Sequence, residues 1–137
     1  MNIFFDVDGT IVHWVGDEAF LRKGVRQALS AIRDDGHTIF LWSGVGKRWE
    51  IVNRFALHPW ITGCYCKPKF DPAARLAEFG VDINPDFVID DYPEIVADFE
   101  GVVIGAFVEG EAGEEFARVI TAIRDSESRR KEQGRCR

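Results

Sequence analysis

Residues 3–10, which read IFFDVDGT, decide the fold. The stretch opens with three consecutive apolar residues, as in a strand that is covered on both faces. Asp6 to Thr10 then place two acids and a glycine where that strand should end, and glycine allows a sharp turn. We expect a buried N-terminal strand that ends in an acidic turn.

The alternation of apolar runs and helical spacing continues along the chain. Further short apolar runs occur at residues 38–42, 63–66, 87–89 and 102–104. Stretches with apolar residues three or four positions apart fall at residues 21–32, 49–56, 73–79 and 116–123. Asp71 and Pro72 are expected to begin the third of these helices as N-cap and first helical residue. The pattern predicts an α/β, doubly wound, parallel five-stranded sheet with helices on both faces.

The length leaves room for one domain. Of the 137 residues, 46% are hydrophobic and 29% charged, close to the values of globular proteins. We expect a catalytic domain over residues 1–125 and a flexible basic tail over residues 126–137. Residues 129–137 carry five basic groups against one acid and no apolar periodicity. They are read either as a frayed end or as an arm for nucleic acid or a partner.

Charge and hydropathy exclude several classes of function. The chain has 17 basic and 23 acidic residues, a net charge of −6, which argues against general nucleic-acid binding. Its start lacks the basic segment and long apolar run of a secretory signal. No apolar stretch approaches the ~20 residues that span a bilayer. We therefore expect a cytoplasmic protein that does not bind membranes.

Polar residues follow four of the five expected strands. Ligands of doubly wound sheets bind beyond the carboxyl ends of the strands, so these residues should meet there. They are Asp6, Asp8, Gly9 and Thr10 after the first strand, Ser43 and Gly44 after the second, Lys67 and Lys69 after the third, and Asp90 and Asp91 after the fourth.

The cluster of acids predicts a bound cation and phosphoryl chemistry. Clustered carboxylates repel one another unless a cation lies among them, and Mg²⁺ suits oxygen ligands and phosphate. The ion would let Asp6 approach an anionic phosphoryl group as a nucleophile. Asp8, on the same side of an extended segment, would be the general acid and base. The residues expected to bind the substrate phosphate are Gly9, Thr10, Ser43, Gly44 and Lys69.

These four motifs, in this order over residues 3–91, resemble the haloacid dehalogenase superfamily. The resemblance implies a Mg²⁺-dependent phosphohydrolase that forms an aspartyl-phosphate on Asp6. It implies that Mg²⁺ is held by the Asp6 carboxylate, the Asp8 backbone carbonyl and an acid of the fourth motif, Asp90 or Asp91. Dehalogenases of the superfamily usually lack the second aspartate and its transport ATPases carry threonine there. Asp8 therefore favours phosphatase or phosphotransferase chemistry.

The resemblance leaves two residues to be assigned: the catalytic lysine and the acid of the fourth motif that binds magnesium. The lysine of the family often stands in a Lys-Pro pair, which favours Lys67, but it often lies two residues before a helix cap, which favours Lys69. We choose Lys67 as the catalytic lysine. The magnesium ligand is usually the second acid of the fourth motif, which favours Asp91, with Asp90 orienting water or the lysine.

The spacing of the motifs leaves no room for a cap domain, only for a small flap after the first strand. The chain thus resembles the capless branch of the superfamily, whose site is open. We expect a phosphorylated substrate, small or macromolecular, and the site to be closed by that substrate or by a second subunit in a homo-oligomer. His13 and Trp14 on the flap, and Trp49, either line the entrance or pack the flap and helix.

Two functions compete with the phosphatase. A signalling receiver domain carries its phosphorylated aspartate after the third strand, where this chain has Cys64 to Lys67 and no acid. A non-catalytic binding or regulatory protein on the same fold would tolerate the loss of a motif residue, and none is missing here.

Overall fold

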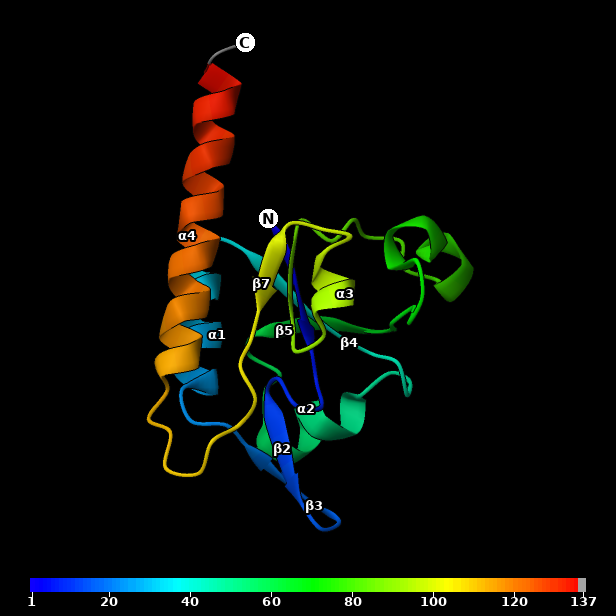
Figure 1. The fold of residues 1–137 in the computed structure, drawn as a ribbon, viewed down its shortest axis with the longest axis vertical. Coiled ribbons are helices and arrows are strands. Elements are labelled where there is room, and N and C mark those ends of the chain that lie inside the picture. Colours follow the sequence, from blue (N-terminus) through cyan, green and yellow to red (C-terminus); the bar gives the residue numbers. More distant parts are fainter. Residues whose placement is uncertain (136–137) are drawn as a thin grey trace.

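A parallel five-stranded sheet forms the centre of the computed structural model, which describes residues 1–135 (Figure 1). Its strands are β1 (Asn2–Asp6), β4 (Thr38–Ser43), β5 (Ile61–Cys66), β6 (Phe87–Asp90) and β7 (Gly101–Val103). They lie side by side in the order β5-β4-β1-β6-β7. All four neighbouring pairs are parallel, so the expected α/β architecture with a five-stranded parallel sheet is confirmed.

The central strand β1 explains why continuous apolar runs mark this sheet. Successive side chains point to opposite faces, and Ile3 and Phe5 pack on one face while Phe4 packs on the other. The first face is covered by α1 (Val25–Asp34), α2 (Trp49–Phe55) and α4 (Glu114–Arg135). The second is covered by α3 (Pro93–Val96) and two short 3₁₀ turns, Pro72–Arg75 and Ala77–Phe79. Both faces of β1 are therefore covered, and its residues Ile3 to Asp6 are all buried.

Residues 73–79, expected to form one helix, form two short 3₁₀ helices, and Pro72 begins the first of them, as expected. Asp71 does not cap that helix: its φ is +46°, in the left-handed region, and its side chain makes no capping hydrogen bond. An N-cap residue is normally extended, so that its oxygen reaches the amides of the first turn. Leu76 and Phe79 still pack on the second face of the sheet.

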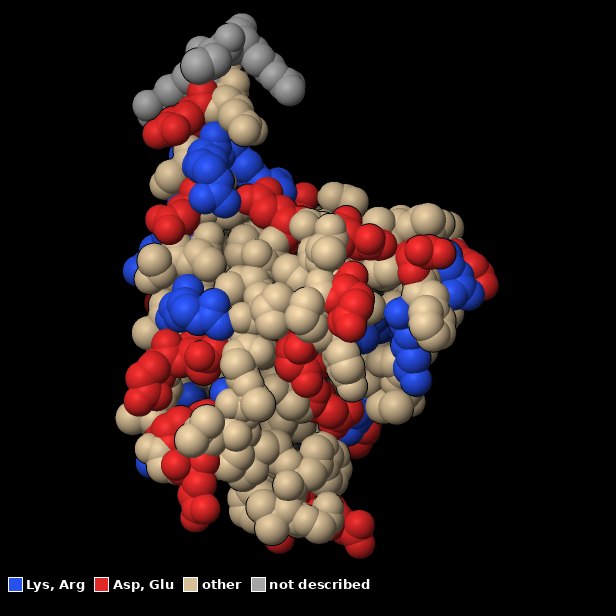
Figure 2. Space-filling model, in the orientation of Figure 1, with Lys and Arg blue, Asp and Glu red and all other residues tan. Residues whose placement is uncertain are grey.

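α4 continues without a break across residues 125 and 126 to Arg135, so residues 126–135, expected as part of a flexible tail, are helical. Long-range contacts hold this part of the helix: Ser126 is buried, and Arg130 donates a 2.8 Å hydrogen bond to the carbonyl of Asp86. Arg129 and Arg130 also pair with Glu100. Figure 2 shows Lys and Arg side chains gathered on the turns of α4 that project past the sheet. Residues 136–137 of the expected tail lie outside the described residues.

The expected flap is an antiparallel hairpin, β2 (Val12–Val15) and β3 (Glu18–Leu21). It follows directly from the turn after β1 and lies at the carboxyl end of that strand (Figure 1). Among the helices of residues 1–135, none combines the length and the apolar character needed to cross a membrane.

Candidate functional site

A pocket of about 500 Å³ opens at the carboxyl ends of β1, β4, β5 and β6. It lies beside the boundary between β1 and β6, where the order of the strands reverses, which is the usual ligand position in such sheets. The lining residues that the sequence predicted are Asp6, Asp8, Ser43, Gly44, Lys67, Lys69 and Asp91. Those that it missed are Val45, Phe70, Tyr92, Glu94 and Ile95.

Two carboxylates and a lysine form a buried cluster at the floor of the pocket, which Asp6 and Lys67 line, while Asp90 lies beneath the lining. Asp6 ends β1 and Asp90 ends the adjacent β6, so the parallel pairing of these strands places both acids at one edge. Lys67 Nζ donates to Asp6 Oδ1 at 2.9 Å and to Asp90 Oδ2 at 2.8 Å. The Thr10 hydroxyl donates to Asp6 Oδ2 at 3.2 Å. Both carboxylate oxygens of Asp6 therefore accept a hydrogen bond.

The electrostatics of this floor depart from those of ordinary surface groups. Burial, together with the charge of Asp90, raises the pKa of Asp6 to about 8. Burial also raises the pKa of Asp90. Burial alone would lower the pKa of Lys67, but the charges of Asp6 and Asp90 outweigh it and raise that pKa. Both carboxylates thus hold a proton more strongly than an exposed aspartate does, even with Lys67 beside them.

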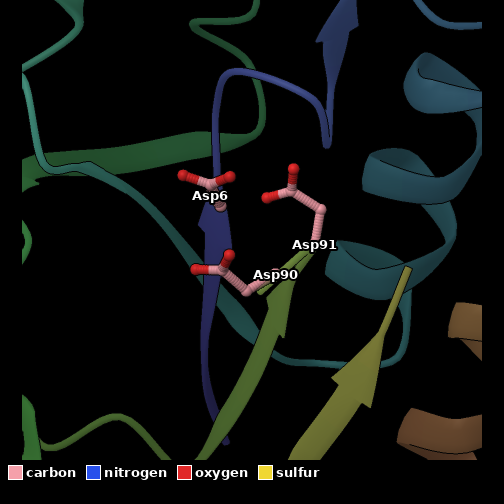
Figure 3. A group of neighbouring side chains, drawn as sticks. All are labelled: Asp6, Asp90 and Asp91. Carbon is pink, nitrogen blue, oxygen red and sulfur yellow. The ribbon is translucent and has the colours of Figure 1, made fainter. Parts of the chain in front are cut away.

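Asp6, Asp90 and Asp91 together have the chemistry of a cation site (Figure 3). Each offers a carboxylate oxygen, and these oxygens all lie within 4.8 Å of one another. Asp91 Oδ1 is buried and has no hydrogen-bond partner within residues 1–135. Three carboxylates beside one lysine leave two negative charges when ionised, which a divalent cation would balance. The set fits Mg²⁺, which prefers oxygen ligands.

The two acids of the fourth motif have different surroundings. Asp90 accepts hydrogen bonds from Lys67 and, at 3.0 Å, from the backbone amide of Tyr92. Asp91 lines the pocket and keeps an uncommitted oxygen. This placement agrees with the choice of Asp91 as the metal ligand and Asp90 as the partner of the lysine, and the roles themselves stay predictions.

Gly9 and Thr10, expected to contact phosphate, do not line the pocket. Gly9 has a φ of +80°, and a Cβ at this position would lie 2.5 Å from Asp91 Oδ2. Thr10 is fully buried, with its hydroxyl on Asp6. Both residues support the carboxylates from behind, and any larger residue at position 9 would displace Asp91.

Asp8 is held at the edge of the pocket by two side chains from other elements. Trp14 Nε1, on the hairpin, donates to Asp8 Oδ1 at 2.9 Å. Arg48, just before α2, forms an ion pair with the other oxygen of Asp8. Sequence reasoning missed Arg48, which stands far from Asp8 in the chain and belongs to no motif. Of the two readings of His13, packing is correct, because its ring stacks on Phe107 with 3.6 Å between ring centroids.

The residues that follow β4 and those that follow β5 line the pocket, as the sequence predicted, but they lie at different depths in it. Ser43 accepts a 2.9 Å hydrogen bond from the Lys67 amide at its carbonyl, which joins the ends of β4 and β5. The stem of Lys69 crosses over Gly44, where a Cβ would lie 2.4 Å from Lys69 Cε. Lys69 lines the wall, whereas Lys67 reaches the buried acids. Lys67 thus contacts the buried acids, and its choice as the catalytic lysine stays a prediction.

A comparison with models of known protein families found no match for this sequence. No curated protein matched it either. The resemblance to the haloacid dehalogenase superfamily therefore rests on the motif residues of this chain alone.

Arg22 is a further residue that sequence reasoning missed, and it holds the turn after β1. It is buried and donates to both carboxylate oxygens of Glu111, at 2.9 and 3.0 Å. The same guanidinium donates to the carbonyls of Gly9 at 3.2 Å and Gly105 at 2.9 Å. Arg22 therefore ties the turn that carries Asp8 and Gly9 to the loop between β7 and α4. Nothing in the sequence pattern connects it with Glu111.

Proposed function

We propose that this protein is a magnesium-dependent phosphohydrolase of the haloacid dehalogenase type that forms an aspartyl-phosphate on Asp6. The observation that carries the proposal is the surroundings of Asp6. It is a buried carboxylate on the central strand, bonded to Lys67, and beside an acid with an uncommitted oxygen. These groups, a lysine and an acid that could share a cation, are of the kind that stabilise phosphoryl charge.

The reaction would proceed in two displacements. In the first, an oxygen of Asp6 attacks phosphorus, the bond between phosphorus and the ester oxygen breaks, and Asp8 gives a proton to the departing alcohol. In the second, Asp8 takes a proton from a water molecule that attacks the aspartyl-phosphate, which releases phosphate and restores Asp6. Trp14 and Arg48 hold Asp8 in place for both steps.

The remaining groups stabilise charge. Lys67 would remain positively charged beside the phosphoryl oxygens, because the adjacent carboxylates raise its pKa. When bound, Mg²⁺ would neutralise the carboxylates and the phosphoryl oxygens. Asp6, Asp90 or Asp91 and the backbone carbonyl of Asp8 would hold it. A receiver domain is disfavoured because β5 ends in Cys66, not in an aspartate.

The test is phosphate release from p-nitrophenyl phosphate by the purified protein, with Mg²⁺ and with a chelator. We expect activity that requires Mg²⁺ and falls more than about 1000-fold in Asp6→Asn. Asp17→Asn, an exposed acid in the hairpin turn, is the matched control and should keep full activity. Equal activity of Asp6→Asn and wild type would refute the covalent mechanism. A wild-type protein that binds Mg²⁺ but releases no phosphate from a panel of esters would indicate a non-catalytic binding protein.

A further inference from the structure

The pocket changes in character from its floor to its mouth. The floor is charged and buried, with Asp6 4% and Lys67 6% exposed. The mouth carries three apolar side chains that are largely exposed: Val45 at 71%, Phe70 at 75% and Tyr92 at 59%. The removal of such side chains from water is favourable in free energy. Their position around one opening therefore indicates a ligand with an apolar part.

These three residues come from separate loops that converge on the pocket. Val45 follows β4, Phe70 follows β5 and Tyr92 follows β6. Below Tyr92, the buried side chain of Ile95 continues the apolar wall inward. The apolar surface therefore extends into the cavity and is not confined to its rim.

The size and charge of the pocket restrict what this apolar part can be. A volume of about 500 Å³ lies within the ~300–1,000 Å³ typical of small-ligand sites, and a phosphoryl group fills only part of it. The charged side chains on the outer wall, Lys69 and Glu94, have opposite signs. The mouth thus offers no net positive charge for a second phosphate, whereas Phe70 and Tyr92 offer faces on which a flat ring can stack.

We propose, on the basis of the proposed function, that the substrates are phosphate monoesters whose alcohol carries an aromatic ring close to the ester oxygen. The phosphoryl group reaches Asp6 and Lys67, and the ring binds against Phe70 and Tyr92 at the mouth. These two aromatic residues determine specificity and take no part in the bond-breaking steps.

The test measures binding, so that its outcome does not depend on turnover. The probes are 2-phenylethylphosphonate and ethylphosphonate, which carry the same headgroup and resist hydrolysis because carbon replaces the ester oxygen. In calorimetry with Mg²⁺, we expect the phenyl compound to bind at least about tenfold more tightly. Phe70→Ala and Tyr92→Ala should each reduce that ratio severalfold. Val108→Ala, an equally exposed apolar residue outside the pocket, should leave the ratio unchanged.

Each outcome separates this proposal from the proposed function. Equal affinities for the two phosphonates, or no binding of either, would overturn the ring-binding proposal, even if p-nitrophenyl phosphate is hydrolysed. A ratio that survives both alanine substitutions would overturn the assignment of Phe70 and Tyr92. Tight binding of the phenyl compound without phosphate release from any ester would support the ring site and refute the hydrolase. For an active enzyme, benzyl phosphate should exceed methyl phosphate in kcat/KM by a similar factor, because these esters match the two phosphonates atom for atom and release alcohols of similar acidity.

Discussion

Replacing Arg22 with methionine tests whether the turn after β1 depends on a buried ion pair. The substitution keeps an unbranched apolar stem but removes every hydrogen bond that the guanidinium donates to Glu111, Gly9 and Gly105. Glu111, whose side chain is only 9% exposed, would lose its charged partner and keep only the hydrogen bond from the Val108 amide. Breaking a buried ion pair from one side costs about 3–5 kcal/mol. For 137 residues, 1 kcal/mol corresponds to about 3.5 °C in Tm, so we expect Tm to fall by about 10–17 °C.

Thermal unfolding followed by circular dichroism measures this loss, and two further variants control it. Arg118→Met breaks the exposed pair with Glu115 and should cost less than about 1 kcal/mol. The double variant Arg22→Met with Glu111→Leu leaves no buried charge and should recover part of the stability. A Tm for Arg22→Met within a few degrees of that for Arg118→Met would refute the reasoning.

The pH dependence gives an independent check on the same pair. Burial raises the pKa of Glu111, but the hydrogen bonds from Arg22 and from the Val108 amide, together with the charge of Arg22, outweigh burial and hold that pKa below its ordinary value of 4.5. An acid with a lowered pKa in the folded state stabilises the protein above pH 4.5 and loses that contribution as pH falls. The gap in Tm between wild type and Arg22→Met should therefore shrink below pH 4.5. A gap that stays constant down to pH 3 would show that the charge of Glu111 is not involved.

Three shorter predictions concern the site and the far end of the sheet. Lys67→Ala should lower kcat about 100-fold or more, and Lys69→Ala much less, because only Lys67 contacts the buried acids; equal losses would reverse the assignment. Trp14→Phe keeps an aromatic ring but removes the hydrogen-bond donor to Asp8, so kcat for p-nitrophenyl phosphate should fall about tenfold, with Tm nearly unchanged. An unchanged kcat would show that Trp14 serves only in packing. Burial lowers the pKa of His37 below 6.5, so the unfolded chain binds a proton at this histidine more readily than the folded protein, and stability is lost as pH falls below 6.5. Between pH 8 and pH 5, Tm should therefore fall less in His37→Gln than in the wild type. Parallel curves of Tm against pH for the two proteins would contradict this.

The sheet and the floor of the pocket could be predicted because local pattern and strand ends determine them. Phe4 and Phe5 are adjacent and both buried, as in a short strand that is covered on two faces. Once the strands are parallel, the residues after them must meet at one edge. Asp6, Lys67 and Asp90 therefore come together without any knowledge of the loops.

The parts that could not be predicted depend on contacts between distant residues. Arg48 and Arg22 looked like ordinary surface arginines, since nothing nearby in sequence shows that Asp8 and Glu111 are their partners. The end of α4 lacks an apolar stripe and looked like a tail, yet Arg130 attaches it to Asp86 and Glu100. A helix that is held by such polar contacts shows no periodic spacing of apolar residues in its sequence.

The central position of β1 also governs when the protein can fold. As the chain is synthesised, β1 emerges first and can pair with β4, but its other edge stays open until Phe87–Asp90 has been made. An open edge of apolar residues invites pairing with other chains, so the growing polypeptide is most exposed to aggregation during this interval. Pairing of β6 closes that edge and brings Asp90 beside Asp6 in the same event. A nascent chain that stops before β6 would therefore lack the carboxylate pair and remain prone to self-association.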